Sequence, residues 1–309
     1  MLKKIAAGSL LLAGILLAGL ALSGCGGTTY STFYGNSTWT ADGKVLCLKD
    51  LETTTKDFTG SQTGLTIADS VVTMSSAGAN ETFSFDVTGD LPYSMTVSPT
   101  AATSQYVAYL GTLNATANTF GKVVVRNIST GTHHGLAEVT LSFPDGIRSA
   151  DWSSDGKTIV YCTTSEVHTI NLDGTGDTAV ITGLTNVSFV SWKYGTKLAY
   201  VHSVGGSTVL SLIKGDGTGN VDLPAAASVD KPQISPANSN LVYGIAGGNF
   251  CSVDVSAGTP ALTVIVSGFK GSLPRLDPTG ALATYDKLSI EDSGVYVLDL
   301  STKAETKIK

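Results

Sequence analysis

The chain has 309 residues and a formal net charge of −6, and only 14% of its residues are charged. Its 35 glycines, with abundant threonine, serine and valine, are typical of short strands joined by tight turns, and argue against a helical or disordered protein. The acidic balance disfavours nucleic acid as a partner, because nucleic acid is bound mainly through lysine and arginine.

The first 24 residues are predicted to be a signal peptide. Lys3 and Lys4 precede an almost unbroken apolar run over residues 5–22, and small residues follow it. A basic start, an apolar stretch and a small-residue end are the pattern of a cleaved export signal. The alternative is an uncleaved transmembrane anchor, since this run is just long enough to span a bilayer.

Leu22-Ser23-Gly24-Cys25 resembles the lipobox of bacterial lipoproteins. The resemblance implies cleavage between Gly24 and Cys25 and acylation of Cys25, first on sulfur and then on the new amine. Several acyl chains would make stable anchoring in a lipid bilayer plausible. Gly26 in place of Asp favours the outer membrane, on its periplasmic side or at the cell surface, if the cell is Gram-negative. We therefore expect a signal peptide over 1–24, a lipidated Cys25 and short tether over 25–29, and one domain over 30–309.

Three further cysteines, Cys47, Cys162 and Cys251, lie in apolar, strand-like runs. An odd number of cysteines beyond an export signal argues against a complete disulfide framework. We expect buried free thiols that pack as small apolar groups.

Residues 150–182 contain the clearest repeat. Strands are predicted at 150–153, 158–161, 166–172 and 179–181, separated by tight turns that include Asp155-Gly156 and Asp173-Gly174. Asp-Gly between apolar runs is a strong hairpin signal, because type I′ turns need positive φ at both central residues. One four-stranded antiparallel sheet cannot bury both of its faces alone, so stacking against copies of itself is expected.

Copies of the first hairpin, WSSDGKTIVY (152–161), recur along the chain. They are VSPTAATSQYVAY (97–109), SWKYGTKLAY (191–200), ISPANSNLVY (234–243) and LDPTGALATY (276–285). A second recurring turn is aligned on Asp50, Asp86, Asn127, Asn171, Lys214, Asp254 and Asp299, at spacings of 36 to 45 residues. This range brackets the ~40–45 residues typical of a four-stranded propeller blade.

The fold class predicted from this count is an all-β propeller with seven blades. The alternative is six blades, which follows if WTADGKVLCL (39–48) is a first hairpin and not a later connection. In either case the ring must close. We expect residues 28–38 to pair with the last strand, 304–308, and deletion of 304–309 to destabilise the fold.

The string WSSDGKTIVY, with a Leu-Asp-Gly turn after it, is similar to the repeats of TolB-type propellers. The resemblance covers the body of the chain and implies a propeller, but it implies no single function. Ser154 replaces the usual proline and Lys193-Tyr194 replace the turn acid, so the role of TolB itself in the envelope does not follow.

The sequence contains no convincing catalytic, cofactor or metal site. The polar loop at 215–222 lacks the glycine and bidentate acid of a calcium loop, and His133-His134, His168 and His202 are expected to be surface or core residues. Gly35-Asn36-Ser37-Thr38-Trp39 lacks the final glycine of a hydrolase elbow. Trp152 and Trp192 sit at one repeat position, equivalent to Ile234 and Leu276, so we expect them, like Trp39, to pack between blades and not to form a carbohydrate platform.

We therefore expect a non-catalytic binding module of the bacterial envelope, anchored through Cys25, that binds an envelope protein or a small ligand on a propeller face. Loops on a rigid scaffold suit such binding. One alternative is a propeller enzyme of the lyase or glycosidase kind, with its site at the axial channel. Another is a structural or adhesive lipoprotein at the cell surface.

Overall fold

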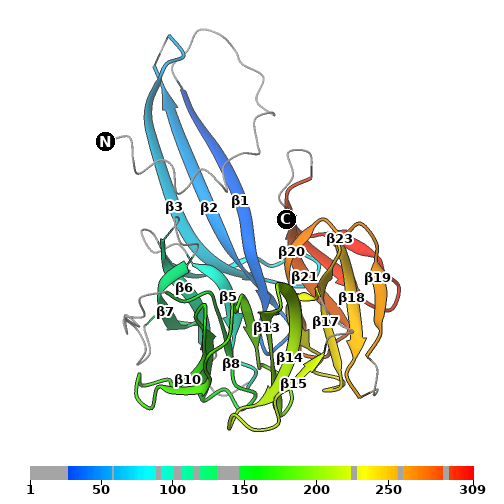
Figure 1. The fold of residues 1–309 in the computed structure, drawn as a ribbon. Helices are drawn as coiled ribbons and strands as arrows, with labels where there is room; N and C mark the ends of the chain where they lie inside the picture. The colour runs from blue at the N-terminus through cyan, green and yellow to red at the C-terminus, as the bar shows by residue number, and fades with distance from the viewer. Residues whose placement is uncertain are drawn as a thin grey trace.

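The computed structural model describes residues 27–57, 59–87, 92–100, 106–114, 119–130, 132, 146–223, 228–256, 260–287 and 292–309. The signal segment, Gly24, Cys25 and the pair His133-His134 lie outside these ranges. Every regular element in the described residues is a β-strand, which confirms the all-β prediction (Figure 1). No helix in this part of the chain is long and apolar enough to cross a membrane.

The first half of the ring contains three antiparallel sheets, each built from strands consecutive in sequence. Blade 1 contains β1 (Gly27–Trp39), β2 (Val45–Lys56), β3 (Gln62–Met74) and β4 (Thr82–Asp86). Blade 2 contains β5 (Tyr93–Val97), β6 (Tyr106–Asn114) and β7 (Thr119–Asn127) among its described residues. Blade 3 contains β8 (Ser149–Trp152), β9 (Thr158–Cys162), β10 (Val167–Asn171) and β11 (Thr178–Ile181).

The second half contains three four-stranded sheets. Blade 4 contains β12 (Phe189–Ser191), β13 (Lys197–Val204), β14 (Ser207–Lys214) and β15 (Val221–Leu223). Blade 5 contains β16 (Asp230–Ile234), β17 (Leu241–Ala246), β18 (Asn249–Asp254) and β19 (Leu262–Val266). Blade 6 contains β20 (Gly271–Leu276), β21 (Leu282–Lys287), β22 (Gly294–Asp299) and β23 (Glu305–Lys307).

The first strand of each blade lies innermost. β1, β5, β8, β12, β16 and β20 contact one another in that order, and β20 contacts β1 again. The chain thus forms a closed ring of six sheets, and the prediction of seven blades was wrong while the six-blade alternative was correct.

The error arose in blade 1. WTADGKVLCL is a first hairpin, because Trp39 ends β1, the amide of Thr40 donates to the carbonyl of Lys44 at 2.8 Å, and β2 follows. Asp50 lies in the middle of β2 opposite Asp69, not in a turn. Strands of twelve and thirteen residues make this blade long enough to resemble two repeats.

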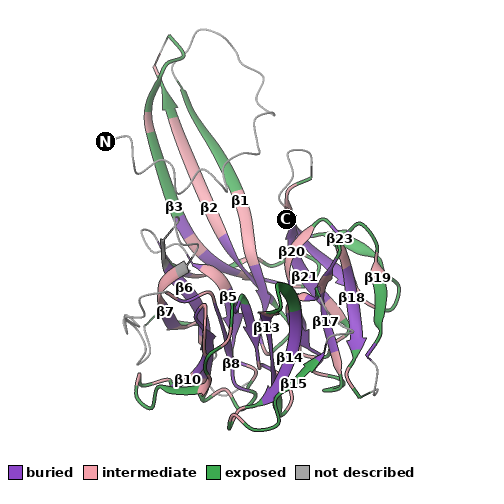
Figure 2. Cartoon of the chain, viewed as in Figure 1, coloured by how far each residue is buried: buried purple, intermediate pink, exposed green. Residues whose placement is uncertain are grey.

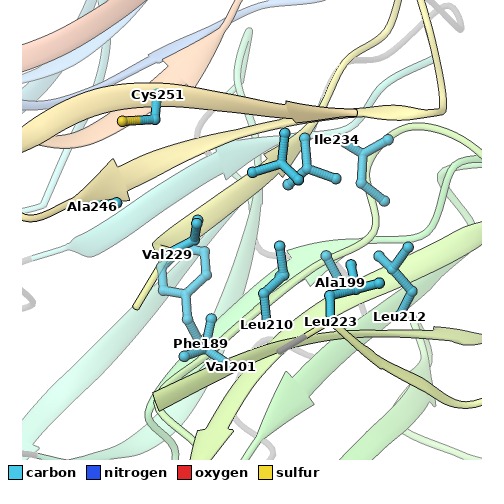
Figure 3. Packing of buried hydrophobic residues seen from close by; sticks show 12 residues of the cluster. Phe189, Ala199, Val201, Leu210, Leu212, Leu223, Val229, Ile234, Ala246 and Cys251 are labelled. Atoms are coloured by element: carbon cyan, nitrogen blue, oxygen red, sulfur yellow. The ribbon is translucent and has the colours of Figure 1, made fainter. Parts of the chain in front are cut away.

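Apolar clusters fill the spaces between neighbouring blades, one at each of the six junctions. Figure 3 shows the junction of blades 4 and 5, where Phe189 and Leu210 face Val229 and Ile234. The last apolar residue of each first hairpin strand packs against the preceding blade; these residues are Trp39, Val97, Trp152, Trp192, Ile234 and Leu276. The expected inter-blade packing of the tryptophans is confirmed.

Side chains close the ring between blades 6 and 1. β1 pairs with β2, and β23 pairs with β22, so the predicted pairing of 28–38 with 304–308 was wrong. Instead, Trp39 Nε1 donates to the carbonyl of Arg275 at 3.0 Å, and Ser37 Oγ donates to Asp286 Oδ1 at 2.7 Å. Ile308 packs on the same seam, against Trp39 and its neighbours.

The outer halves of β1, β2 and β3 form an arm that projects from the ring (Figure 1). We define the arm as residues 27–34, 49–57 and 59–69. It is mostly exposed or intermediate, unlike the buried interior of the blades (Figure 2). Threonines dominate its sequence, and β-branched side chains favour extended backbone, which helps these strands persist without a core.

Candidate axial site

Six buried polar residues surround the propeller axis, one from the first strand of each blade. Each immediately precedes the apolar residue that packs against the preceding blade, which we call the inter-blade apolar position. All six are at most 4% exposed: Thr38, Thr96, Asp151, Ser191, Gln233 and Arg275. In five blades this residue is neutral or acidic, and only blade 6 supplies a cation. We call this set the axial ring.

A second set of buried polar residues immediately follows the apolar position: Thr40, Ser98, Ser153, Lys193, Ser235 and Asp277. Several of them hold the first hairpin turn. Thr40 Oγ1 accepts from the amide of Lys44 at 2.9 Å, and Ser153 Oγ accepts from the amide of Thr158 at 3.0 Å. Lys193 differs, because a lysine has no acceptor atom with which to hold the turn.

Asp151 bridges three blades at the axis. Its Oδ1 accepts from Thr96 Oγ1 of blade 2 at 2.7 Å, and its Oδ2 accepts from Ser191 Oγ of blade 4 at 3.0 Å. The amides of Trp192 and Lys193 also donate to Oδ2, at 3.0 and 3.3 Å. This fully buried carboxylate is therefore satisfied by neutral donors.

Arg275 extends from blade 6 across the axis. Its Nη2 donates to Ser94 Oγ of blade 2 at 3.1 Å, and its guanidinium carbon lies 5.9 Å from the ring centre of Phe189 in blade 4. Neither blade is a neighbour of blade 6, so the side chain must pass through the middle of the ring. Among the described residues, its buried Nε has no hydrogen-bond partner.

Burial shifts the ionisation of the charged groups at this site. Desolvation lowers the pKa of Lys193 to about 8, opposed by the charge of Asp151, and lowers the pKa of Arg275 as well. Desolvation raises the pKa of Asp286 to about 6, although three donors on Ser37 and Asn36 stabilise its charged form. The carboxylates thus already have donors, whereas Arg275 retains an unused donor at its buried Nε.

Sequence reasoning did not single out Asp151 or Arg275, and it named Lys193 only as a departure from the turn of the TolB-type repeat. Each occupies a fixed offset from the inter-blade apolar position, so an alignment of the six first hairpins would have shown two acids and two cations among Ser, Thr and Gln residues. Their meeting at the axis depends on the number of blades, which the sequence left open.

Residues that the sequence analysis read as structural have structural contacts. Asp155 Oδ1 accepts from Ser153 Oγ at 2.6 Å within its hairpin. In the 215–222 loop, Asp216 Oδ1 accepts from the amide of Thr218, as Asp173 does from Thr175. These aspartates therefore stabilise the turns in which they lie.

The histidines and cysteines within the described residues lie in the blades. His168 contacts Glu166 and Asp177, and His202 contacts Ser211 at 3.0 Å. Cys47, Cys162 and Cys251 are buried free thiols, as expected. In this part of the chain, no group of three or more His, Cys, Asp or Glu residues is arranged to hold a metal ion.

A pair of acids lies at the base of the arm. Asp50 and Asp69 are directly opposite each other on β2 and β3. Burial, together with the neighbouring charge of Asp69, raises the pKa of Asp50 to about 7, and burial also raises the pKa of Asp69. The pair therefore retains a proton at a pH where ordinary aspartates are ionised.

A hollow of about 310 Å³ lies near these acids on blade 1. Its walls are Lys49, Leu51, Ala68, Asp69, Ser70, Val72, Glu81, Phe83 and Asp86. Phe83 is 64% exposed, so a large apolar ring is accessible at this hollow.

No protein-family model matches the chain, and no curated protein matches it. Solved structures do match its fold. The nidogen/laminin complex aligns over 90% of this chain and 92% of the matched chain, with 11% identity and a TM-score of 0.57. TolB from Acinetobacter baumannii aligns over 90% of this chain and 68% of its own, with 15% identity and a TM-score of 0.50.

An oligogalacturonate lyase in complex with manganese also matches, over 87% of this chain and 90% of its own, with 13% identity and a TM-score of 0.48. At these identities the comparisons show the fold alone. This chain folds as a six-bladed β-propeller, and its fold is similar to that of TolB.

Proposed function

We propose that the protein is a lipid-anchored binding module of the bacterial envelope, and that the propeller carries its binding surfaces. The observation that carries this proposal is the path of β1. This strand begins at Gly27, two residues after Cys25, follows the arm and ends inside the ring at Trp39. A lipid on Cys25 would therefore attach at the outer end of the arm.

The arm would then separate the propeller from the bilayer. Its β1 segment, residues 27–34, is about 25 Å long at ~3.3 Å per residue. Residues 27–29, which the sequence analysis assigned to a tether, already belong to β1. The propeller, with its loops on a rigid ring, would stand clear of the headgroups and remain open to partners.

Exposed apolar side chains on the arm support a role near the membrane or a partner. Tyr30 is 70% exposed, Leu65 50% and Ile67 44%. Leu65 and Ile67 lie on one face of β3, two residues apart, so their side chains point the same way. Such residues are compatible with the interfacial region that an anchored arm would enter.

The test begins with metabolic labelling by a clickable fatty acid in cells that express the full chain. Wild type is expected to carry label and to fractionate with membranes, whereas Cys25→Ala should lose both. Cys47→Ala, which removes a buried thiol, is the matched control and should keep both. Label that persists in Cys25→Ala would refute the anchor.

The binding role is tested by chemical crosslinking of intact cells, followed by mass spectrometry. Specific envelope proteins should be captured with wild type and lost after loop substitutions that leave thermal unfolding unchanged. For a Gram-negative cell we propose an outer-membrane location, and protease treatment of intact cells distinguishes its two sides. Degradation in intact cells indicates the surface, and protection indicates the periplasm.

A further inference from the structure

We propose that the propeller axis binds a small oxyanion, a carboxylate or phosphate group, between Arg275 and Lys193. Both side chains are at least nine-tenths buried, at 3% and 6% exposure. Among the described residues, neither forms an ion pair within 4.0 Å with a carboxylate. Arg275 lies over the ring of Phe189 and Lys193 over the ring of Tyr194, but neither touches a counter-charge, so a bound anion would relieve part of the desolvation cost of burying them.

The acids nearest the axis do not contact these cations, although the charge of Asp151 favours the cationic form of both and that of Asp286 favours it in Arg275. Asp151 uses its oxygens on the hydroxyls and amides of blades 2 and 4, and Asp286 uses its oxygens on Asn36 and Ser37 at the seam. Asp277 accepts hydrogen bonds within its own hairpin, from Thr279 and Leu282. All three are held by neutral donors.

An unused donor remains on Arg275. The guanidinium of Arg275 donates from Nη2 to Ser94, but its buried Nε has no partner within the described part of the chain. A planar guanidinium with free N–H groups binds carboxylate and phosphate oxygens well, because its donors match their spacing.

Lys193 supplies the second charge. It occupies the position at which the other five blades have Ser, Thr or Asp, so the turn itself gives no reason for a lysine there. Burial lowers its pKa most, the charge of Asp151 opposes this, and the charge of Arg275 lowers the pKa further, so the two cations lie within electrostatic range of each other. An anion between them would restore the full charge of Lys193.

The probe is sodium phosphate, with sodium acetate as a second arm and sodium chloride at matched ionic strength as the reference. The full chain in non-ionic detergent is heated in each, and its Tm is recorded. Saturating oxyanion should raise the Tm of wild type by about 3–6 °C above chloride. The better of the two salts shows whether the site prefers phosphate or carboxylate.

Arg275→Met replaces the guanidinium by an apolar side chain of similar length. Without oxyanion this variant should be as stable as wild type or more stable, because a buried unpaired charge is removed. Its Tm should not respond to either salt, and Lys193→Met should weaken apparent affinity at least tenfold. Lys157→Met, an exposed lysine in a hairpin turn, is the control and should respond as wild type does.

A wild-type Tm that responds to phosphate and acetate no more than to chloride would overturn the proposal. So would a full response in Arg275→Met, or in Lys193→Met. If Arg275→Met does not fold, the proposal is tested by calorimetric titration of phosphate and acetate into wild type and into Lys193→Met. Saturable heat that is lost in Lys193→Met supports the site, and its absence from wild type refutes it.

Discussion

At the scale of single residues, two adjacent positions in the first strand of each blade have different roles. The apolar position holds neighbouring blades together, and Trp152 illustrates it. Its ring is fully buried, and its Nε1 donates to the carbonyl of Thr96 in blade 2 at 3.0 Å. The preceding residue, Asp151, instead links blades 2 and 4 near the axis.

The sequence predicted the first of these roles and not the second. An apolar or aromatic residue at a repeated position has one common explanation, which is packing, and the six junction clusters agree with it. A buried aspartate or arginine has several explanations that depend on what surrounds it. Those surroundings come from strands in other blades, far away in the sequence.

Asp50 gives a residue-scale prediction. Its pKa in the folded protein is raised to about 7 by burial beside Asp69, while an unfolded aspartate ionises near 3.9. Between about pH 4 and pH 7 the folded state therefore holds a proton that the unfolded state has lost, and stability must fall as pH rises. Asp50→Asn should flatten this slope and add on the order of 1–3 kcal/mol at pH 8.

Urea unfolding of the full chain from pH 4 to pH 8 measures this slope. Glu52→Gln, two residues further along β2 on the same face, is the matched control and should retain it. A wild-type slope that survives in Asp50→Asn would show that the acid pair does not control the stability of blade 1.

At the scale of elements, agreement between sequence and structure was best where a blade is regular. The strands expected at 150–182 correspond closely to β8, β9, β10 and β11. Blade 1 was misread because its strands continue into the arm, where side chains alternate without a core to oppose them. Local pattern shows that a segment is extended, but not how far a strand runs beyond the sheet it belongs to.

The C-terminal segment gives an element-scale prediction. Deletion of 304–309 should lower thermal stability markedly. The reason is not the loss of a pairing between 28–38 and 304–308, because those segments do not pair. It removes β23, which covers the edge of β22, and it removes Ile308 from the blade 1–blade 6 cluster. Ile308→Ala alone should cost about 2–4 kcal/mol in urea unfolding.

Lys309→Ala is the control for Ile308→Ala, because it removes a charge next to the apolar cluster and leaves the packing of Ile308 intact. The Lys309 ammonium lies 2.9 Å from Glu81, but both side chains are partly exposed, so its loss should cost about 1 kcal/mol or less. A deletion that leaves thermal unfolding unchanged, or an Ile308→Ala variant as stable as Lys309→Ala, would contradict the importance of this cluster.

At the scale of the whole molecule, the arm and the ring are expected to be separable. The outer arm contributes little buried apolar surface, whereas all six junction clusters lie within the ring (Figure 2). We therefore predict that an arm shortened by replacing 53–66 with Asn-Gly leaves the Tm within about 2 °C of wild type. Differential scanning calorimetry checks this.

Leu46→Ala is the positive control for that measurement. Leu46 is fully buried at the junction of blades 1 and 2, and its truncation should cost about 2–5 kcal/mol. If shortening the arm lowers the Tm as much as Leu46→Ala does, the arm is a stabilising part of the propeller.

The long pairing of β1 with β2 also has a mechanical consequence. A lipid on Cys25 would transmit any pull on the propeller along the axis of β1, while the hydrogen bonds to β2 run across it. A load in that direction strains many bonds at once, from Gly27 to Trp39, and does not peel them apart one by one. The strand that would join the protein to its membrane is thus arranged to resist detachment by shear.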